Sequence, residues 1–272
     1  MESIARRNRK RKILDILEAR GTIDINELAS ILGISHITLR RDLKDLERQG
    51  LISKVWGGVT LSPHSFLETP IEDRGVENLD EKRAIARTAL TLIKPGDIVG
   101  LGGGTTTYEL AKLLRGIPNI QVITNAVNIA YLLIRLGVKV IMPGGYSREG
   151  SYTLNDNRIE EFFKSTYMDK LFLGADGIDI DMGVTTTNPA EILLIKAMTS
   201  SSNLIVVLAD HSKIGRKRLI PVIALENIHV LITDEKAPPD ILSSLEKKGI
   251  KVEIASSIHE PEIYSQSEYK FE

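Results

Sequence analysis

Apolar residues recur at helical spacing three times within the first sixty positions. The three sets are Ile13, Ile16 and Leu17; Leu28, Ile31 and Leu32; and Leu39, Leu43 and Leu46. Spacings of three and four residues place the members of each set on one face of a helix. The run that follows, LISKVWGGVT, is rich in β-forming residues and contains a glycine pair, which suits a hairpin. The pattern predicts an α+β domain of three short helices and a hairpin over residues 1–60.

The pattern changes beyond this domain. Residues 61–80 contain two prolines and no periodic apolar spacing, which is typical of a linker. From residue 81 to residue 256, helix-like stretches alternate with short apolar runs of the kind found in strands buried on both faces of a parallel sheet. These runs are DIVGLG, IQVIT, VKVIMPGG, DKLFLGAD, NLIVVLAD, IHVLITD and IKVEIA. They predict an open α/β domain with a mainly parallel sheet over residues 81–256. The polar tail, residues 257–272, is assigned no role.

Composition then limits the classes of function. The chain has no cysteine, which excludes disulfides and thiol chemistry, and its five histidines lack metal-ligand spacing. We therefore expect no metal and no cofactor. No run has the length and apolarity of a signal-peptide core or a membrane span, so we expect a cytoplasmic protein without membrane contact. Residues 1–60 hold 12 Lys or Arg against 8 Asp or Glu, and residues 61–272 hold 23 against 28. This asymmetry suggests that the first domain faces a polyanion.

The stretch GISHITLRRDLKDLERQG, residues 33–50, predicts a helix with two distinct faces. Ser35 is a good N-cap, and Ile34 and Leu39 occupy the positions of a hydrophobic staple. At about 100° per residue, the leucines of the stretch share one face. The opposite face carries Ile37, Arg41, Lys44 and Arg48, with His36 and Arg40 beside them. An exposed isoleucine within a basic stripe is unusual on a helix that is only solvated.

This face suits the major groove of DNA, where Arg and Lys reach guanine edges or phosphates and an apolar group can meet a thymine methyl. The preceding helix ends at Gly33, and a short glycine-containing turn joins the two helices, as in a helix-turn-helix. A charged face on an isolated helix would fit simple solvation equally well. The turn, the basic arm at residues 6–12 and the WGGV hairpin favour DNA binding.

The stretch DIVGLGGGTTTYELAKLL, residues 97–114, predicts a strand, a glycine loop and a helix. Free backbone N–H groups and the helix dipole favour an anion at such a helix start. The stretch is neither a P-loop nor a dinucleotide fingerprint, and a glycine turn after a strand is by itself more often structural. Polar residues also follow the other predicted strands, where open α/β sheets gather ligands, and they suit sugar hydroxyls and phosphate. The candidate binding residues at these strand ends are Gly102, Gly103, Gly104, Thr105, Thr106, Thr107, Thr124, Asn125, Gly144, Gly145, Asp176, Asp210 and Lys213.

Both domains resemble one family. ARGTIDINELASILGISHITLRRDLKDLERQGLISKVWGGV resembles the winged helix-turn-helix of DeoR-type transcriptional regulators, with its T-x-R-R-D-L core, L-E-x-x-G and GG wing. The resemblance implies that Thr38, Arg40 and Arg41 contact operator DNA and that Asp42 orients an arginine or caps locally. Trp56 stands where a histidine usually precedes the two glycines. The indole N–H could still donate to a phosphate, so the candidate DNA-binding residues are Ser35, His36, Ile37, Thr38, Arg40, Arg41, Lys44, Arg48 and Trp56.

The second domain resembles the effector domain of the same family, which is itself similar to ribose-phosphate isomerases. The motifs GTTT, TN, PGG, GADGID, TTTN and ADHSK occur in the family's order. They add Thr186 and Asn188 to the candidate effector site and imply a phosphorylated sugar as effector. Because one recognition helix contacts only a few base pairs, we also expect a homo-oligomer, a dimer or tetramer, on repeated half-sites.

The isomerase similarity raises an alternative, a sugar-phosphate isomerase with an appended DNA-binding domain. Aldose–ketose isomerisation needs a carboxylate base and a stabilised enediolate. Asp176 and Asp179 match the isomerases' aspartates, but Ile195 occupies the later glutamate position and Glu191 is a displaced candidate base. The sequence therefore predicts a regulator of carbohydrate-metabolism genes, a repressor with no catalytic residues, and ranks an RNA-binding or scaffold protein last.

Overall fold

The computed structural model describes residues 4–48, 51–62, 71–147, 151–156 and 158–256. The chain divides into two compact units, Met1–Glu68 and Thr69–Glu272. Residues 63–70, 148–150 and the predicted tail from 257 lie outside the described residues. In the part of the chain that the structure describes, no helix is long and apolar enough to cross a membrane.

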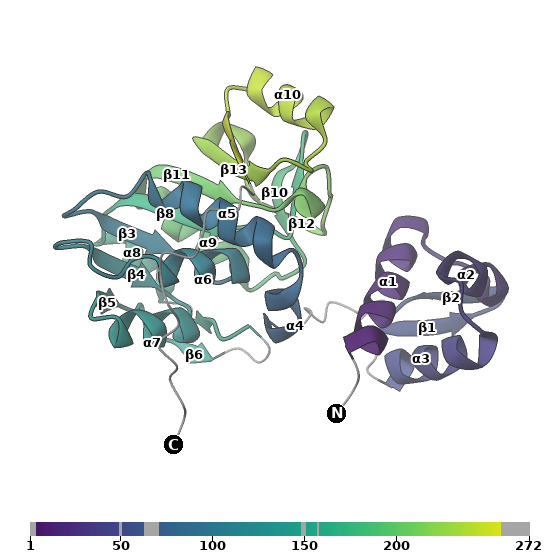
Figure 1. Cartoon of the computed structure of the whole chain (residues 1–272). Helices are drawn as coiled ribbons and strands as arrows, with labels where there is room; N and C mark the ends of the chain where they lie inside the picture. Colours follow the sequence, from purple (N-terminus) through teal and green to yellow (C-terminus); the bar gives the residue numbers. More distant parts are fainter. Residues whose placement is uncertain (1–3, 49–50, 63–70, 148–150, 157, 257–272) are drawn as a thin grey trace. The chain divides into compact units, whose positions relative to one another are not determined.

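The first unit contains three helices and one antiparallel hairpin, as the sequence predicts (Figure 1). The elements are α1 (Ile4–Arg20), α2 (Ile25–Leu32), α3 (His36–Arg48), β1 (Ile52–Val55) and β2 (Gly58–Leu61). Asp24 caps α2 by accepting hydrogen bonds from the N–H groups of Asn26 and Glu27, and Gly33 ends the helix in the left-handed conformation, with φ of 62°. The predicted leucine face of α3 lies in the core of this unit.

The second unit is built on a seven-stranded parallel sheet in the order β14-β13-β11-β8-β3-β4-β5. The strands are β3 (Ile98–Leu101), β4 (Gln121–Thr124), β5 (Lys139–Ile141), β8 (Met168–Gly174), β11 (Ser202–Leu208), β13 (Val230–Asp234) and β14 (Lys251–Ala255). Five of them fall within a predicted run, and β8 and β11 each begin one residue before theirs. In β11, Ile205 and Val207 join one hydrophobic cluster while Val206 and Leu208 join the other, so both faces of the sheet are buried.

Helices cover the two faces of this sheet (Figure 1). One face is covered by α5 (Leu79–Leu90), α6 (Thr105–Lys112) and α7 (Val127–Arg135), and the other by α8 (Ile159–Lys164), α9 (Glu191–Ser200) and α10 (Pro239–Lys247). The chain turns from one side of the sheet to the other between β3 and β8. This reversal is the topological switch point, where open α/β folds bind ligands beyond the carboxyl ends of the strands.

Several elements were not predicted. A three-stranded antiparallel sheet joins β9 (Gly177–Asp179), β10 (Gly183–Thr186) and β12 (Ile220–Ile223), and β6 (Tyr146–Ser147) pairs with β7 (Leu154–Asn155). Two short 3-10 helices are η1 (His211–Lys213) and η2 (Leu225–Asn227). The interval expected to be a linker, residues 61–80, includes α4 (Ile71–Val76) and the start of α5. Three consecutive charged residues within α4, Glu72, Asp73 and Arg74, interrupt any apolar period there and hide the helix.

Candidate nucleic-acid interface and anion site

Helix α3 begins at residue 36 because Ser35 caps it. The backbone N–H of Thr38 donates to Ser35 Oγ at 3.3 Å, and the two hydroxyls lie 2.9 Å apart. Leu39 is fully buried, whereas Ile37 is 68% exposed. The sequence thus folds α3 so that the leucines fill the core and the isoleucine faces water.

The predicted basic stripe lies on the exposed side of this helix. Arg40, Arg41, Lys44 and Arg48 are all exposed, and so is His36. Among the described residues, none of the four cations has a hydrogen-bond or ion-pair partner for its charged group. Their charge is therefore available to an external anion.

The cations of α1 are used differently. Arg6 Nε and Arg9 Nε donate to the two oxygens of Asp42 at 3.0 and 2.6 Å, and Asp42 is 1% exposed. Asp45 accepts from Arg6 at 2.7 Å and lies 3.2 Å from Lys10 Nζ. Asp42 therefore holds two arginines, and three cations of the arm expected to support DNA binding are committed to fastening α1 to α3.

The wing is a tight hairpin with an apolar tip. Ile23 and Val59 exchange two backbone hydrogen bonds of 3.0 and 2.9 Å, which ties β2 to the segment before α2. A Cβ on Gly58 would lie 2.0 Å from Ile23 O, so glycine is required there. Trp56 is fully exposed at the tip, and Lys54 Nζ donates to Glu47 Oε2 at 2.5 Å.

In the second unit, the strand ends bring part of the predicted effector set together. Gly102 N–H donates to Phe172 O at 3.0 Å, so the glycine loop after β3 lies beside the end of β8 at the switch point. Asp176 Oδ2 accepts from the Thr186 hydroxyl at 2.9 Å, and the Thr186 oxygen accepts from the N–H of Asn188 at 3.1 Å. Thr186 lies in the antiparallel sheet, not at the end of a parallel strand, and reaches Asp176 from there.

Other predicted residues have local structural partners. The Thr107 hydroxyl donates to Gly104 O at 3.1 Å within the first turn of α6, and Thr124 Oγ1 accepts from Ala126 N–H at 3.1 Å. A Cβ on Gly145 would lie 2.7 Å from Asn155 O, so that glycine permits the β6–β7 crossing. Asn125 differs, because it is fully buried and its Oδ1 has no partner.

Three residues that the sequence did not single out complete the cluster. Arg74 of α4 lies 3.8 Å from Asp176 Oδ1, and Lys82 Nζ of α5 donates to Arg74 O at 2.5 Å. Asn78 Nδ2 donates to Asp210 Oδ1 at 2.9 Å. The first two helices after residue 70 are therefore fastened to the ends of β8 and β11.

The charges of this cluster perturb one another. Burial lowers the pKa of Lys82 to about 8, although Asp210 nearby acts in the opposite direction. Burial alone would raise the pKa of Asp210, but Lys213, the Ser212 hydroxyl, Lys82 and Asn78 together hold it below its usual value. Lys82 is 4% exposed and no carboxylate of the described residues lies within ion-pair distance of it. A buried ammonium with spare donors favours an anion.

The sequence does contain a signal for Lys82. Lys82, Ile85, Ala86 and Ala89 follow the three- and four-residue spacing of a helix face, and all four are buried. A lysine on an otherwise apolar face is costly unless its charge is used. The helix begins at Leu79, so its first two residues fall within the interval that was predicted to be a linker.

Comparison with known proteins identifies the family. A family model described as the DeoR C-terminal sensor domain matches residues 77–235, and one described as a DeoR-like helix-turn-helix domain matches residues 9–64. This chain belongs to the DeoR family of transcriptional regulators. An Escherichia coli O157:H7 protein named as an aga operon transcriptional repressor is 36% identical over 90% of this chain and 92% of its own. The transcriptional regulator GolR of Listeria innocua is 34% identical over 91% of this chain and 98% of its own.

Solved structures offer a more distant likeness. Ribose 5-phosphate isomerase A from Methanocaldococcus jannaschii is 20% identical, with a TM-score of 0.39, over 51% of this chain and 55% of that chain. In this DeoR-family chain, Asp179 Oδ1 accepts from the N–H groups of Asp181 and Met182 at 2.9 and 2.8 Å, which closes a turn. Among the described residues, no group of three or more His, Asp or Glu is arranged to hold a metal ion.

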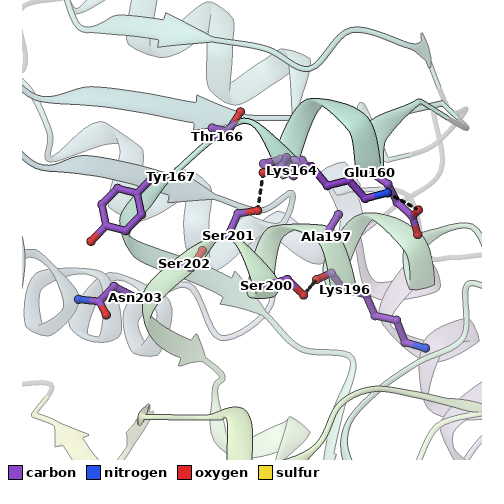
Figure 2. Close-up of a pocket in the computed structure, with 11 residues that line it drawn as sticks. Glu160, Lys164, Thr166, Tyr167, Lys196, Ala197, Ser200, Ser201, Ser202 and Asn203 are labelled. Atoms are coloured by element: carbon purple, nitrogen blue, oxygen red, sulfur yellow. Dashed lines mark hydrogen bonds and ion pairs between the residues drawn. The ribbon is translucent and has the colours of Figure 1, made fainter.

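A cavity of about 490 Å³ lies elsewhere in this DeoR-family chain, between α8 and α9 at the amino ends of β8 and β11 (Figure 2). Its hydroxyls already have partners, since Ser200 donates to Lys196 O at 2.8 Å and Ser201 to Phe163 O at 2.6 Å. None of the predicted effector residues lines it. It is therefore separate from the strand carboxyl ends, where the charged cluster lies.

Proposed function

We propose that this chain is a cytoplasmic repressor that binds operator DNA through α3 and the wing, and that a phosphorylated sugar bound at the strand carboxyl ends controls it. The observation that carries the proposal is the contrast between two sets of cations in this chain. Arg6, Arg9 and Lys10 of α1 have carboxylate partners, whereas the described cations of α3 and the buried Lys82 have none.

The DNA contact follows from the exposed face of α3. Unpaired Arg and Lys side chains neutralise phosphates and read guanine edges, while the exposed Ile37 provides an apolar contact for a thymine methyl. Each recognition helix covers only a few base pairs, so we propose that two or more copies act together on repeated half-sites.

The effector contact follows from the charged cluster. The phosphate is proposed to bind at the start of α6, where Gly103 and Gly104 leave the backbone accessible, with Lys82 and Lys213 supplying positive charge. Asp176 and the unpartnered Asn125 Oδ1 offer acceptors for sugar hydroxyls. One DeoR-family relative is named as a repressor of the aga operon, which supports a regulator, and we propose that this chain releases its ligand unchanged.

The coupling would pass through α4 and α5. An anion beside Lys82 and Lys213 would compete with Asp210 for the positive charge of these two lysines. It would thereby weaken the attraction between Asp210 and the start of α5, where Asn78 Nδ2 donates to Asp210 at 2.9 Å. These helices follow the segment that leads from the winged helix. An effector acts only if it binds one arrangement more tightly than the other.

Two variants test the two halves separately. Fluorescence anisotropy would measure binding of the full-length protein to a labelled duplex from its own upstream DNA, with and without a panel of phosphorylated sugars. Thermal denaturation of the same samples would report effector binding, since a ligand at about 100 times its Kd adds about 2.7 kcal/mol to the free energy of unfolding. Unphosphorylated forms of the same sugars are the matched control.

We expect Arg41→Ala to lose operator affinity and keep the thermal stabilisation by the effector. We expect Lys82→Gln to keep operator affinity and lose the thermal stabilisation by the effector. Loss of both properties in either variant would contradict the modular assignment. Conversion of ribose 5-phosphate at rates typical of enzymes would favour the isomerase alternative instead.

A further inference from the structure

The tip of the wing is apolar, not basic. Trp56 is 103% exposed, the highest value of any large apolar residue that the structure describes, and its neighbour Val55 is 42% exposed. Lys54, the cation closest to the tip, already donates to Glu47 of α3. The hairpin therefore presents a ring and a methyl-bearing side chain where a phosphate contact would call for a free cation.

The tip is also held in place by the backbone. Val59 is fully buried and Ile52 is 2% exposed, so both strands of the hairpin are anchored in the core. The two hydrogen bonds between Ile23 and Val59 fix the return strand, and Gly58 allows the close approach that those bonds need. Val55 pairs with Gly58 across the hairpin, so Trp56 and Gly57 form its turn and the backbone of Trp56 is held at the tip.

We propose that Trp56 enters the minor groove of the operator beside the site of α3, and thereby sets a preference for A·T pairs at that position. The indole ring would pack against the sugars and partly unstack one base step, as apolar wedges do in minor-groove binding. Its Nε1–H would donate to N3 of adenine or O2 of thymine, the acceptors exposed on the groove floor. The Glu47–Lys54 ion pair joins the base of the wing to the last turn of α3, which makes the wing continuous with the proposed DNA surface.

Chemistry distinguishes this arrangement from a phosphate contact. An indole that donates to a phosphate uses only its N–H and leaves the large ring in water. A groove contact buries the ring and satisfies the N–H at once. Pyrimidine–purine steps unstack most easily, so the preference should be strongest where such a step lies under the wing. The inference rests on the proposed DNA-binding function.

Trp56 is the single tryptophan of the chain, so its emission reports directly on the wing. Full-length protein would be titrated with the operator duplex while Trp56 emission and its quenching by acrylamide are recorded. Anisotropy of labelled DNA would measure binding independently. We expect the emission to be quenched and the ring to become shielded from acrylamide in proportion to the bound fraction.

Variants and DNA flanks make the test specific. Trp56→Ala should weaken operator binding about tenfold, as loss of an aromatic–base contact does elsewhere, with an unchanged melting temperature because the side chain is fully exposed. Replacing A·T by G·C pairs beneath the wing should weaken the wild-type protein and leave Trp56→Ala unaffected. Trp56→Phe keeps the ring and should retain part of the affinity but lose most of the A·T preference.

Three results would overturn the inference. Normal operator binding with unchanged emission and acrylamide access contradicts this inference alone. Equal or tighter binding by Trp56→Lys, with a steeper salt dependence, assigns the wing to a phosphate instead. Absence of operator binding by the wild-type chain contradicts the proposed function and this inference with it.

Discussion

Arg9 of α1 donates to Asp42 of α3 across 2.6 Å, and the Asp42 carboxylate that receives it is 1% exposed. Arg6 occupies the other oxygen of the same carboxylate at 3.0 Å. Arg6 and Arg9 therefore hold α1 against α3 through Asp42. Arg40, Arg41, Lys44 and Arg48 on the exposed face of α3 have no such carboxylate partner among the described residues.

Asp42→Asn should destabilise the first unit because it leaves two arginines without their buried partner. Both arginines retain some access to water, so we expect a loss of about 2 kcal/mol, less than the roughly 3–5 kcal/mol that breaking a fully buried ion pair costs. Calorimetry of the full chain would detect a lower melting temperature for the first unit. Asp45→Asn is the matched control, because the Asp45 side chain is 30% exposed and its loss should cost less. An equal effect of the two substitutions would contradict the special role of Asp42.

Local patterns were sufficient to predict most of the fold. The seven strands were predictable because each contains a short run rich in Val, Ile or Leu, and the clearest case is β13, where all five residues are buried. The leucine face of α3 was predictable because its residues repeat within one helix. The family resemblance implied that Asp42 orients an arginine or caps locally, but the identity of its partners was open, because Arg9 and Arg6 lie 33 and 36 positions away and nothing local selects them.

The proposed anion site was less predictable for the same reason. Gly103 and Asp176 could be placed because they directly follow strands. Lys82 and Asn78 could not, since they come from the start of a helix that reaches the strand ends only through the fold. Thr186 entered the candidate site only through the family motif TTTN, and the structure places it at the end of a buried antiparallel strand, where Thr185 donates to Gly177 O at 3.2 Å.

The wing offers a paired test of its backbone. Gly58→Ala would place a Cβ 2.0 Å from Ile23 O, so the Ile23–Val59 bridge must open and the first unit should lose about 2 kcal/mol or more. Gly57 has φ of +91° but nothing within 4 Å of its Cβ position, so Gly57→Ala should cost only about 1 kcal/mol of left-handed strain. Urea denaturation of both variants would measure the difference. A larger loss for Gly57→Ala would refute this account of the wing.

The division between free and paired cations predicts how salt acts. Lys44→Ala should weaken operator binding and reduce the slope of log K against log salt by about one, as expected for one lost phosphate contact. Arg20→Ala should change neither, because Arg20 Nη1 is 2.8 Å from Glu27 and lies in the same unit. Anisotropy titrations at several salt concentrations give both slopes. Equal slopes for wild-type protein and Lys44→Ala would remove Lys44 from the DNA surface.

Lys82 should make effector binding depend on pH. Its pKa of about 8 means that it carries its charge below that pH and loses it above, so affinity for a phosphorylated sugar should fall as pH rises through about 8. Asp210 and Glu77 favour the charged form, whereas burial, Lys213 and Arg74 oppose it. The ligand adds a lower limit, because a phosphate monoester takes its second negative charge only above about pH 6. Affinity should therefore be greatest between these two values.

Proton uptake identifies Lys82 as the cause of this pH dependence. An anion stabilises the ammonium, so binding near pH 8 should draw a proton from solution, and calorimetry in buffers of different ionisation enthalpy measures it. Lys82→Gln should abolish the proton uptake. Lys213→Gln should weaken ligand binding but leave the proton uptake in place. In the free protein the pKa of Lys82 is lower in the folded state, at about 8, than in the unfolded state, at 10.5. The free energy of unfolding of the wild type should therefore rise relative to that of Lys82→Gln as pH rises from about 8 to 10.5, whereas a lysine with a carboxylate partner would show the opposite trend. Uptake that persists in Lys82→Gln would mean that another group binds the proton and that Lys82 is not the phosphate's counter-charge.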